Sequence, residues 1–356
     1  MFLEQQSLSN LKIIPHRLRF RQPARTSRSV LHDRLVYFII VGERDVEHGM
    51  RGWGEIAPLD GLSPEDTEFH RVLRTLAAGT MDSRMWNYLV SFPSFRFGLE
   101  AATHDLAAGG RCIWYDSPFV RGESTIPING LIWMGEKEFM LDQIREKLKA
   151  GYPCLKLKIG GIRFEEEIDL LRFIRREFSA DDLEIRLDAN GSLAVEDAEE
   201  NLKRLRSYHI HSIEQPIRAG QVGEMAELCE KNIIPIALDE ELIGIKTTSE
   251  KKAILDIIKP QYLIFKPSLI GGIAETQEYI ELCKKRSTSW WITSALESNV
   301  GLNILAQFCG LLGTTHTQGL GTGHLFTNNI ESPLREYQGR IYMEENGRWG
   351  SIINQS

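Results

Sequence analysis

The sequence lacks any cysteine pair of the CxxC type, and its five cysteines are scattered singly along 356 residues. An odd number of dispersed cysteines does not suit a disulfide framework, so we expect buried thiols in a reducing compartment. No apolar run approaches the length needed to cross a membrane. The opening MFLEQQSLSNLKII lacks a basic segment followed by a long apolar one, so no signal peptide is predicted. We therefore expect a cytoplasmic protein.

Basic runs and aromatic-basic clusters are also missing, and the formal net charge is −7. This balance argues against general binding to nucleic acid, and we expect neither a nucleic-acid nor a membrane partner. Apolar residues make up 42% and charged residues 26% of the chain, as in an ordinary globular protein. The length allows one large barrel and a smaller domain, while the oligomeric state stays undefined.

The first part of the chain, residues 1–125, has the pattern of an α+β domain. Strands are predicted over 11–20, 34–42 and 52–59. The polar stretch RQPARTSRS between the first two is expected to be a loop. From about residue 64 to 109 the pattern becomes helical, and small residues there suit close helix packing.

Residues 126–331 alternate short apolar strands with amphipathic helices. The predicted strands are IPING, LKLKIG, IRLDAN, HSIEQP, PIALDE, LIFKPS, WWITSALES and the stretch around THTQGLG. Eight strands with intervening helices favour an α/β fold of the (β/α)₈ TIM-barrel type over an open sheet. Residues 332–356 are predicted to form a hairpin that turns at Asn346-Gly347 and returns toward the first domain.

Charged residues stand at the carboxyl ends of successive predicted strands: Lys158, Asp188, Glu214, Asp239 and Lys266. In a barrel these ends meet at the active-site face. Lys156 shares a strand face with Lys158, an arrangement that costs free energy unless the lysines have a function.

Three carboxylates without a nearby histidine or cysteine favour Mg²⁺, with Mn²⁺ as a substitute, over zinc. A lysine beside a dication is expected to have a lowered pKa and can then act as a general base. The metal would hold a substrate carboxylate and stabilise an enediolate, so the pattern predicts proton abstraction next to a carboxylate. Lys158 is the predicted base, and Lys156 is predicted to tune it and to contact the carboxylate.

Each feature alone has a simpler interpretation. An acidic residue at a strand end is often a helix N-cap, and a KxK pair is often a solvated edge strand. A match at successive strand ends is much harder to reach by chance, so we favour the functional interpretation of the whole set.

At these positions the sequence resembles the muconate-lactonizing subgroup of the enolase superfamily. The motifs are KLK (Lys156, Lys158), DAN (Asp188), EQP (Glu214), LDE (Asp239) and FKPS (Lys266). GWGEIAPLDGLSPE resembles the loop of the family's capping domain that closes over substrate, and FRFGLEAATHDL the helix that leads into the barrel. The resemblance implies a modified (β/α)₈ barrel with an N-terminal α+β capping domain.

Within the subgroup, SALESNVG and GLGTGHLF resemble the seventh- and eighth-strand segments of members that dehydrate a succinyl-bearing cyclohexadiene carboxylate in menaquinone biosynthesis. The Asp-x-Asp with which dipeptide epimerases grip an amino group is missing there, and glycine-rich backbone suits a carboxylate instead. The resemblance implies that Lys158 removes the α-proton and returns a proton to the departing hydroxide. Lys266, on the opposite side, would stabilise the anionic intermediate.

Five further residues are candidates for substrate binding: Ser294, Ser298, Asn190, Gly321 and Arg28. Serines at a strand end are equally often turn residues, Asn190 could simply form a turn, and Arg28 could be a solvated loop residue. Whether Glu240 or Glu297 contributes to the site stays open.

Two alternatives remain. A muconate-type cycloisomerase or an N-acylamino acid racemase would use the same metal and lysines. A non-catalytic barrel of the same fold is less favoured, because nothing would then preserve a set of charged groups that face inward.

Overall fold

The computed structural model describes residues 11–25, 30–42, 49–65, 68–78 and 82–350. The first part forms an antiparallel sheet in the order β1-β2-β3 with helices on one face. Its elements are β1 (Leu11–Arg25), β2 (Val30–Gly42), β3 (Arg51–Ile56), α1 (Phe69–Ala78), α2 (Ser83–Tyr88), the 3₁₀ turn η1 (Leu89–Ser91) and α3 (Pro93–Ala107).

Strand β2 is apolar on both faces because the sheet is covered on both sides. Its residues Tyr37 and Ile39 pack in the cluster with the helices of this domain. The alternating residues Val36 and Phe38 pack in the main core shared with the barrel. The continuous run VYFIIV therefore places the N-terminal sheet between its own helices and the barrel.

The stretch RQPARTSRS differs from its predicted loop structure. Its first part continues β1 as far as Arg25, and the pairing with β2 shifts register between Arg19 and Ala24. A register shift of this kind lets a polar strand end extend beyond the regular ladder. The remainder, from residue 26 to 29, lies outside the described residues.

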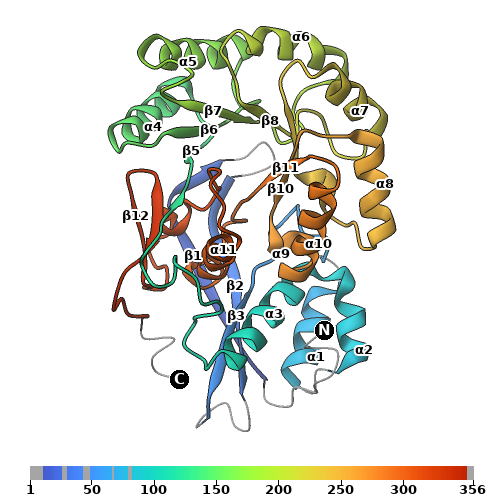
Figure 1. Cartoon of the computed structure of the whole chain (residues 1–356), viewed down its shortest axis with the longest axis vertical. Coiled ribbons are helices and arrows are strands. Elements are labelled where there is room, and N and C mark those ends of the chain that lie inside the picture. Colours follow the sequence, from blue (N-terminus) through green and yellow to red (C-terminus); the bar gives the residue numbers. More distant parts are fainter. Residues whose placement is uncertain (1–10, 26–29, 43–48, 66–67, 79–81, 351–356) are drawn as a thin grey trace.

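The barrel contains a parallel sheet in the order β5 to β11, whose strands curve around a common axis above the N-terminal domain in Figure 1. Its strands are β5 (Gly130–Ile132), β6 (Cys154–Lys158), β7 (Glu184–Asp188), β8 (Ser212–Glu214), β9 (Ile236–Leu238), β10 (Tyr262–Phe265) and β11 (Ser289–Ile292). Its helices are α4 (Lys137–Lys149), α5 (Phe164–Glu177), α6 (Val195–Arg206), α7 (Val222–Lys231), α8 (Thr248–Ile258), α9 (Pro267–Ile270), α10 (Ile273–Lys284) and α11 (Asn299–Leu312), with the 3₁₀ turn η2 (Glu240–Leu242) after β9.

The predicted eighth strand closes this sheet, although it is only two bridges long. Gln318 bridges to Ile128 and Gly319 to Thr293, both in the parallel sense. The barrel is therefore completed between its first and seventh strands, and the predicted fold class is confirmed.

The C-terminal hairpin forms earlier along the chain than predicted. Strands β12 (Leu334–Tyr337) and β13 (Arg340–Met343) are joined at Gln338-Gly339, where both residues have positive φ. Positive φ at both turn residues matches the twist of a two-residue hairpin, so this dipeptide and not Asn346-Gly347 makes the turn. The hairpin pairs with β4 (Ile126–Pro127), and the link to the N-terminal sheet comes before it, from Phe326 and the 3₁₀ turn η3 (Gly323–Leu325).

Ala237, Ile264 and Trp291, on β9, β10 and β11, form a small apolar cluster separate from the main core, with Tyr262 packed against it. All five cysteines are buried free thiols. Among the described residues, no helix combines the length and the apolar character needed to cross a membrane.

Candidate active site

Six charged side chains meet at the carboxyl ends of β6 to β10. Parallel pairing sets Lys158 beside Asp188, and Asp188 beside Glu214, at one level of the barrel. Asp239 and Lys266 follow β9 and β10 directly, and Lys156 lies two residues before Lys158 on the same face of β6. Strand register therefore brings together side chains that lie as much as 110 residues apart in sequence.

These groups form a buried network of ion pairs. Lys156 Nζ lies 3.0 Å from Asp188 Oδ2 and also contacts Glu214 Oε2. Lys158 Nζ lies 2.9 Å from Asp188 Oδ2. Lys266 contacts Asp239 Oδ2 and lies 3.8 Å from Glu214 Oε1. Because each lysine faces a carboxylate, the network is nearly neutral despite its burial.

The carboxylates respond unequally to this environment. Burial raises the pKa of Asp188, but Lys156, Lys158 and Lys266 outweigh it, so the pKa lies well below the usual value. Burial and the neighbouring Asp188 raise the pKa of Glu214 to about 7. Burial also raises the pKa of Asp239.

In this network carboxylates set the pKa of Lys156 and Lys266, whereas the predicted lowering concerned a lysine beside a dication. Burial lowers the pKa of Lys156, but Asp188 and Glu214 outweigh this effect and raise it. The pKa of Lys266 is raised for the same reason, by Asp239 and Glu214 against burial. With carboxylates as their neighbours, both lysines are held as ammonium groups.

The donor chemistry of the site fits a hard cation. Both carboxylate oxygens of Glu214 are buried: Oε2 contacts Lys156 Nζ and Oε1 lies 3.8 Å from Lys266 Nζ, in both cases outside regular hydrogen-bond geometry. Such oxygens are costly to bury unless a cation compensates them. As they stand, the described residues contain no group of three acidic, histidine or cysteine side chains that converges on one point. The carboxylates are instead turned toward the lysine ammonium groups.

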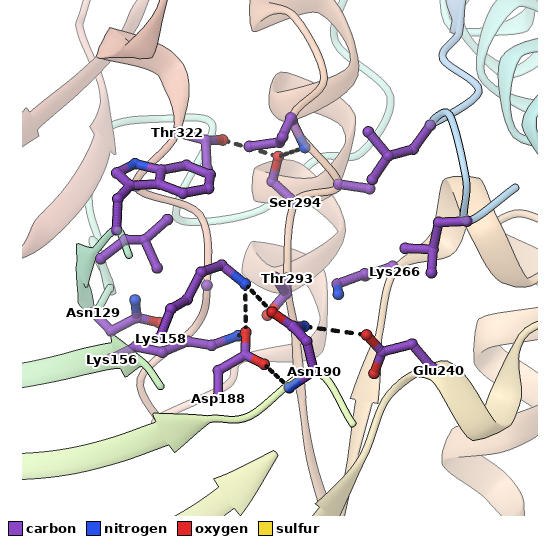
Figure 2. Close-up of a pocket in the computed structure, with 18 residues that line it drawn as sticks. Asn129, Lys156, Lys158, Asp188, Asn190, Glu240, Lys266, Thr293, Ser294 and Thr322 are labelled. Carbon is purple, nitrogen blue, oxygen red and sulfur yellow. Dashed lines mark hydrogen bonds and ion pairs between the residues drawn. The ribbon is translucent and has the colours of Figure 1, made fainter. Parts of the chain in front are cut away.

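A cavity of about 730 Å³, counting its part open to solvent, lies over this network. Figure 2 shows Lys158 and Lys266 extending into the same space from opposite sides. The polar residues that line the cavity are Asn129, Lys156, Lys158, Asp188, Asn190, Glu240, Lys266, Thr293, Ser294 and Thr322.

Asn190 links the ammonium group of Lys158 to Glu240. Its Oδ1 accepts a hydrogen bond from Lys158 Nζ at 2.7 Å, and its Nδ2 donates to Glu240 Oε1 at 3.1 Å (Figure 2). Its backbone has a φ of 46°, and its N–H donates to Asp188 Oδ1 at 3.2 Å. Asn190 thus orients Lys158 through its amide, and Glu240 contributes to the cavity wall.

The other predicted substrate-binding residues are placed differently from one another. Ser294 and Gly321 line the cavity, and Ser294 Oγ accepts a hydrogen bond from Thr322 Oγ1 at 2.9 Å (Figure 2). Ser298 is fully buried, is not among the lining residues, and caps α11 through Val300 N at 3.1 Å. Arg28 lies outside the described residues.

Several lining residues were missed from the sequence, among them Trp133 and Thr293. Leu59 and Leu62 lie in GWGEIAPLDGLSPE, the segment whose resemblance implied a loop over the substrate, and both line the cavity. The first barrel strand was placed at IPING, but the structure continues it as β5 to Ile132, so its carboxyl end presents Trp133. The Lys158 ammonium lies 6.0 Å from the centre of the Trp133 indole ring. The uninterrupted run GLIW was the available signal for this later strand end.

Comparison with known proteins places these features in a family. Residues 140–347 match the family described as "Enolase C-terminal domain-like". An o-succinylbenzoate synthase from Desulfotalea psychrophila is 46% identical over 349 residues, covering 88% of this chain and 94% of that protein. The o-succinylbenzoate synthase of Bacillus subtilis is 26% identical, with 82% and 80% of the two chains covered.

Solved structures agree with the sequence relatives. The crystal structure of MenC from Desulfotalea psychrophila superposes with a TM-score of 0.81 at 40% identity, covering 94% of this chain and all of that one. A dipeptide epimerase from Cytophaga hutchinsonii, complexed with Mg and a dipeptide, gives a TM-score of 0.81 at 21% identity over 96% of this chain and 94% of that chain. At that identity the second likeness concerns the fold alone.

Proposed function

The chain belongs to the family of enolase C-terminal domain-like proteins, and from this premise we propose that it is an o-succinylbenzoate synthase, a carbon-oxygen lyase. The reaction removes water from 2-succinyl-6-hydroxy-2,4-cyclohexadiene-1-carboxylate and yields 2-succinylbenzoate for menaquinone biosynthesis. The observation that carries the proposal is the network of three lysines and three carboxylates beneath a cavity into which Lys156, Lys158 and Lys266 all open.

Asp188, Glu214 and Asp239 are the proposed ligands of Mg²⁺, and the oxygen-only chemistry of these three buried carboxylates supports this assignment. When bound, Mg²⁺ supplies a Lewis acid that makes the α-proton of the substrate carboxylate more acidic. The lysine ammonium groups now paired with the carboxylates would then become available to the substrate.

Lys158 is the proposed general base. Its Nζ is held by Asp188 and by the amide oxygen of Asn190, which fixes its position at the edge of the cavity. It would take the α-proton, and the electron pair of the broken C–H bond would move onto the substrate carboxylate. This pair would then return to form the ring double bond as the C–O bond breaks. The same ammonium group would give its proton to the departing hydroxide, so that water leaves and Lys158 returns to its neutral form.

Lys266 is the proposed electrostatic partner on the opposite side. It is buried and contacts Asp239, and in this network its pKa is raised, chiefly by Asp239 against the effect of burial, so it is held here as an ammonium group. A fixed cation is suited to stabilise the negative charge that develops on the substrate carboxylate. Lys156, paired with Asp188 and Glu214, would hold these carboxylates in place.

Ser294, Asn190 and Gly321 remain proposed substrate contacts, supported by their place in the cavity wall. Ser298 and Arg28 remain proposals without that support. We also propose a cytoplasmic location, since five buried free thiols suit a reducing compartment.

A direct assay tests the function. The purified chain is incubated with the cyclohexadiene carboxylate and Mg²⁺, and the loss of diene absorbance and the appearance of 2-succinylbenzoate are followed. We expect turnover that stops when EDTA is added and resumes with excess Mg²⁺. No product under these conditions would refute the proposed function.

A racemase side activity is a second candidate, because Lys158 and Lys266 both reach the cavity and could exchange protons on opposite faces of a substrate. Incubation with an N-succinylamino acid in D₂O tests it by NMR. Incorporation of deuterium at the α-carbon with loss of optical purity would support this activity, and full retention of the α-proton would exclude it.

A further inference from the structure

Arg34 is a buried guanidinium group at the junction of the two domains. It lies on β2 and is 5% exposed. Its Nη2 donates to the carbonyl oxygens of Ala57 at 2.5 Å and Pro58 at 3.2 Å, and its Nη1 donates to the carbonyl oxygen of Ala295. All three acceptors are main-chain atoms, so Arg34 holds backbone rather than a particular side chain.

The acceptors belong to two loops on different domains. Residues 57–62, here the cap loop, follow β3 and contribute Leu59 and Leu62 to the wall of the active-site cavity. Residues 293–298, here the barrel loop, follow β11 and contribute Ser294, Ala295 and Leu296. Arg34 is not itself among the lining residues. Arg34 therefore connects the two loops that form walls of the cavity, but its own side chain does not line the cavity.

The barrel loop needs such support because its backbone is strained. Leu296 has a φ of 67°, a region that a leucine rarely adopts. Within the loop, Leu296 N donates to Ser294 Oγ at 3.0 Å, and Ala295 N donates to Glu297 Oε2 at 2.7 Å. These bonds fix the N–H groups, and Arg34 fixes the Ala295 carbonyl from the other domain.

A second buried charge from the N-terminal sheet acts on the same segment. Glu55, on β3, accepts hydrogen bonds from the N–H groups of Ser298 and Gly301, both at 2.8 Å. Gly301 allows this approach, because a Cβ there would lie 2.7 Å from Glu297 Cβ and 3.0 Å from Glu55 Oε2. The barrel loop and the start of α11 are thus held by two residues of the other domain.

Only an arginine can make the Arg34 contacts together. The planar guanidinium group has N–H donors on three nitrogens and can reach several acceptors at once, whereas the donors of a lysine are all on one nitrogen. No carboxylate forms an ion pair with Arg34 in the described part of the chain, and Glu297, Glu55 and Asp60 act on it only through space. Burying a cation in this way is costly, which argues against a purely packing role.

We propose that Arg34 is a positioning residue for the reaction: it sets the distance between the cap loop and the barrel loop, and so the shape of the cavity wall that receives the non-reacting part of the substrate. The inference rests on the proposed function. Because the hydrogen bonds of Arg34 among the described residues go to the backbone of the two loops and not to Lys158, Lys266 or Asp188, loss of Arg34 should weaken substrate binding far more than it slows the chemical step.

The test compares Arg34→Met and Arg34→Lys with the wild type and with Arg17→Met. Arg17 is the control, since it lies on the adjacent β1, its side chain is 57% exposed and pairs with Asp33 at 2.6 Å. It borders a pocket with Pro58 and Leu59, but among the described residues its side chain makes no hydrogen bond to either loop. We expect both Arg34 variants to raise KM about 10-fold or more with kcat changed less than about 3-fold. Arg17→Met should match the wild type.

The two Arg34 variants separate the alternatives. If only the positive charge matters, Arg34→Lys will restore the wild-type KM, and the proposal is overturned. A KM within twofold of wild type in both variants also overturns it, as does a fall in kcat alone. If Arg34→Met fails to fold, Arg34→Lys decides by the same criteria.

Hydrogen exchange provides a measurement independent of turnover. Backbone amides 294–298 should exchange at least ~10-fold faster in Arg34→Lys than in the wild type, and should be unchanged in Arg17→Met. Unchanged exchange in the Arg34 variants would refute the positioning role. If the wild-type protein binds the substrate but does not dehydrate it, the proposed function is refuted. The hydrogen-exchange measurement would still test whether Arg34 positions the barrel loop.

Discussion

Replacement of Lys158 by alanine should abolish turnover while the chain still folds. The side chain is 11% exposed, and its ammonium group contacts Asp188 and Asn190. Asp188 would keep Lys156 at 3.0 Å as a partner, so the truncation does not leave an unpaired buried carboxylate. We expect a loss of stability of ~1–3 kcal/mol, which a well-folded domain of this size tolerates.

The effect on the rate should be much larger than the effect on stability. A positioned general base contributes roughly 10² to 10⁴ in rate, and here the same group also returns the proton. A fall in kcat of at least ~10³ is expected, equivalent to about 4 kcal/mol in the activation barrier. KM should change little, because Lys158 acts on the reacting atom.

The assay follows product absorbance for three variants. Lys158→Arg keeps the charge but cannot act as a base near neutral pH, so it should be as inactive as Lys158→Ala. Lys231 is an exposed lysine on α7, so Lys231→Ala controls for the loss of a lysine elsewhere and should retain full activity. Circular dichroism and thermal unfolding check that each variant is folded. More than about a tenth of the wild-type kcat in Lys158→Ala would mean that another group is the base.

Three further predictions concern the metal, the domain packing and pH. Removing the charge from one proposed metal ligand (Asp188→Asn, Glu214→Gln or Asp239→Asn) should weaken Mg²⁺ binding by ~10-fold or more in calorimetric titration, and unchanged affinity would remove that residue from the set. Gly54→Ala should destabilise the protein by ~2–4 kcal/mol in urea unfolding, because a Cβ there would lie 2.0 Å from a carbonyl oxygen of α3; a change below about 0.5 kcal/mol would contradict this packing. Burial raises the pKa of Glu100 to about 7, so the unfolded chain loses this proton first as the pH rises from about 4.5, and stability falls up to pH 7. Glu100→Gln should remove up to ~3 kcal/mol of this decline in the free energy of unfolding, measured by denaturant unfolding between about pH 4.5 and pH 7. If the variant showed the same dependence of stability on pH as the wild type, the Glu100 carboxyl would have an ordinary pKa.

Much of the fold could be predicted because its signals are local. Amphipathic periodicity identified α5, α6 and α7, and alternating or continuous apolar runs identified the strands between them. The hairpin turn was misplaced because Asn346-Gly347 is the stronger turn dipeptide by composition, whereas pairing with β4 selects Gln338-Gly339. Pairing between strands that are far apart in the chain cannot be detected in a short stretch of sequence.

The candidate site could likewise be predicted only in part from the sequence. Lys158, Asp188, Glu214, Asp239 and Lys266 were visible because each stands at the end of a strand, and parallel strands align their ends by geometry alone. Their present pairing was not visible, since which ammonium group faces which carboxylate depends on distances across the barrel.

The sequence by itself determined the order of strands and helices, the charged residues at the strand ends and, through these, the class of chemistry. Only the tertiary structure decided which residues form the cavity wall, because that wall is made where two domains meet. Leu59 and Ala295 look like ordinary apolar residues in sequence, and Arg34 looks like one more basic residue of a strand. Their roles arise from contacts between segments about 240 to 260 residues apart, which depend on the packing of one domain against the other.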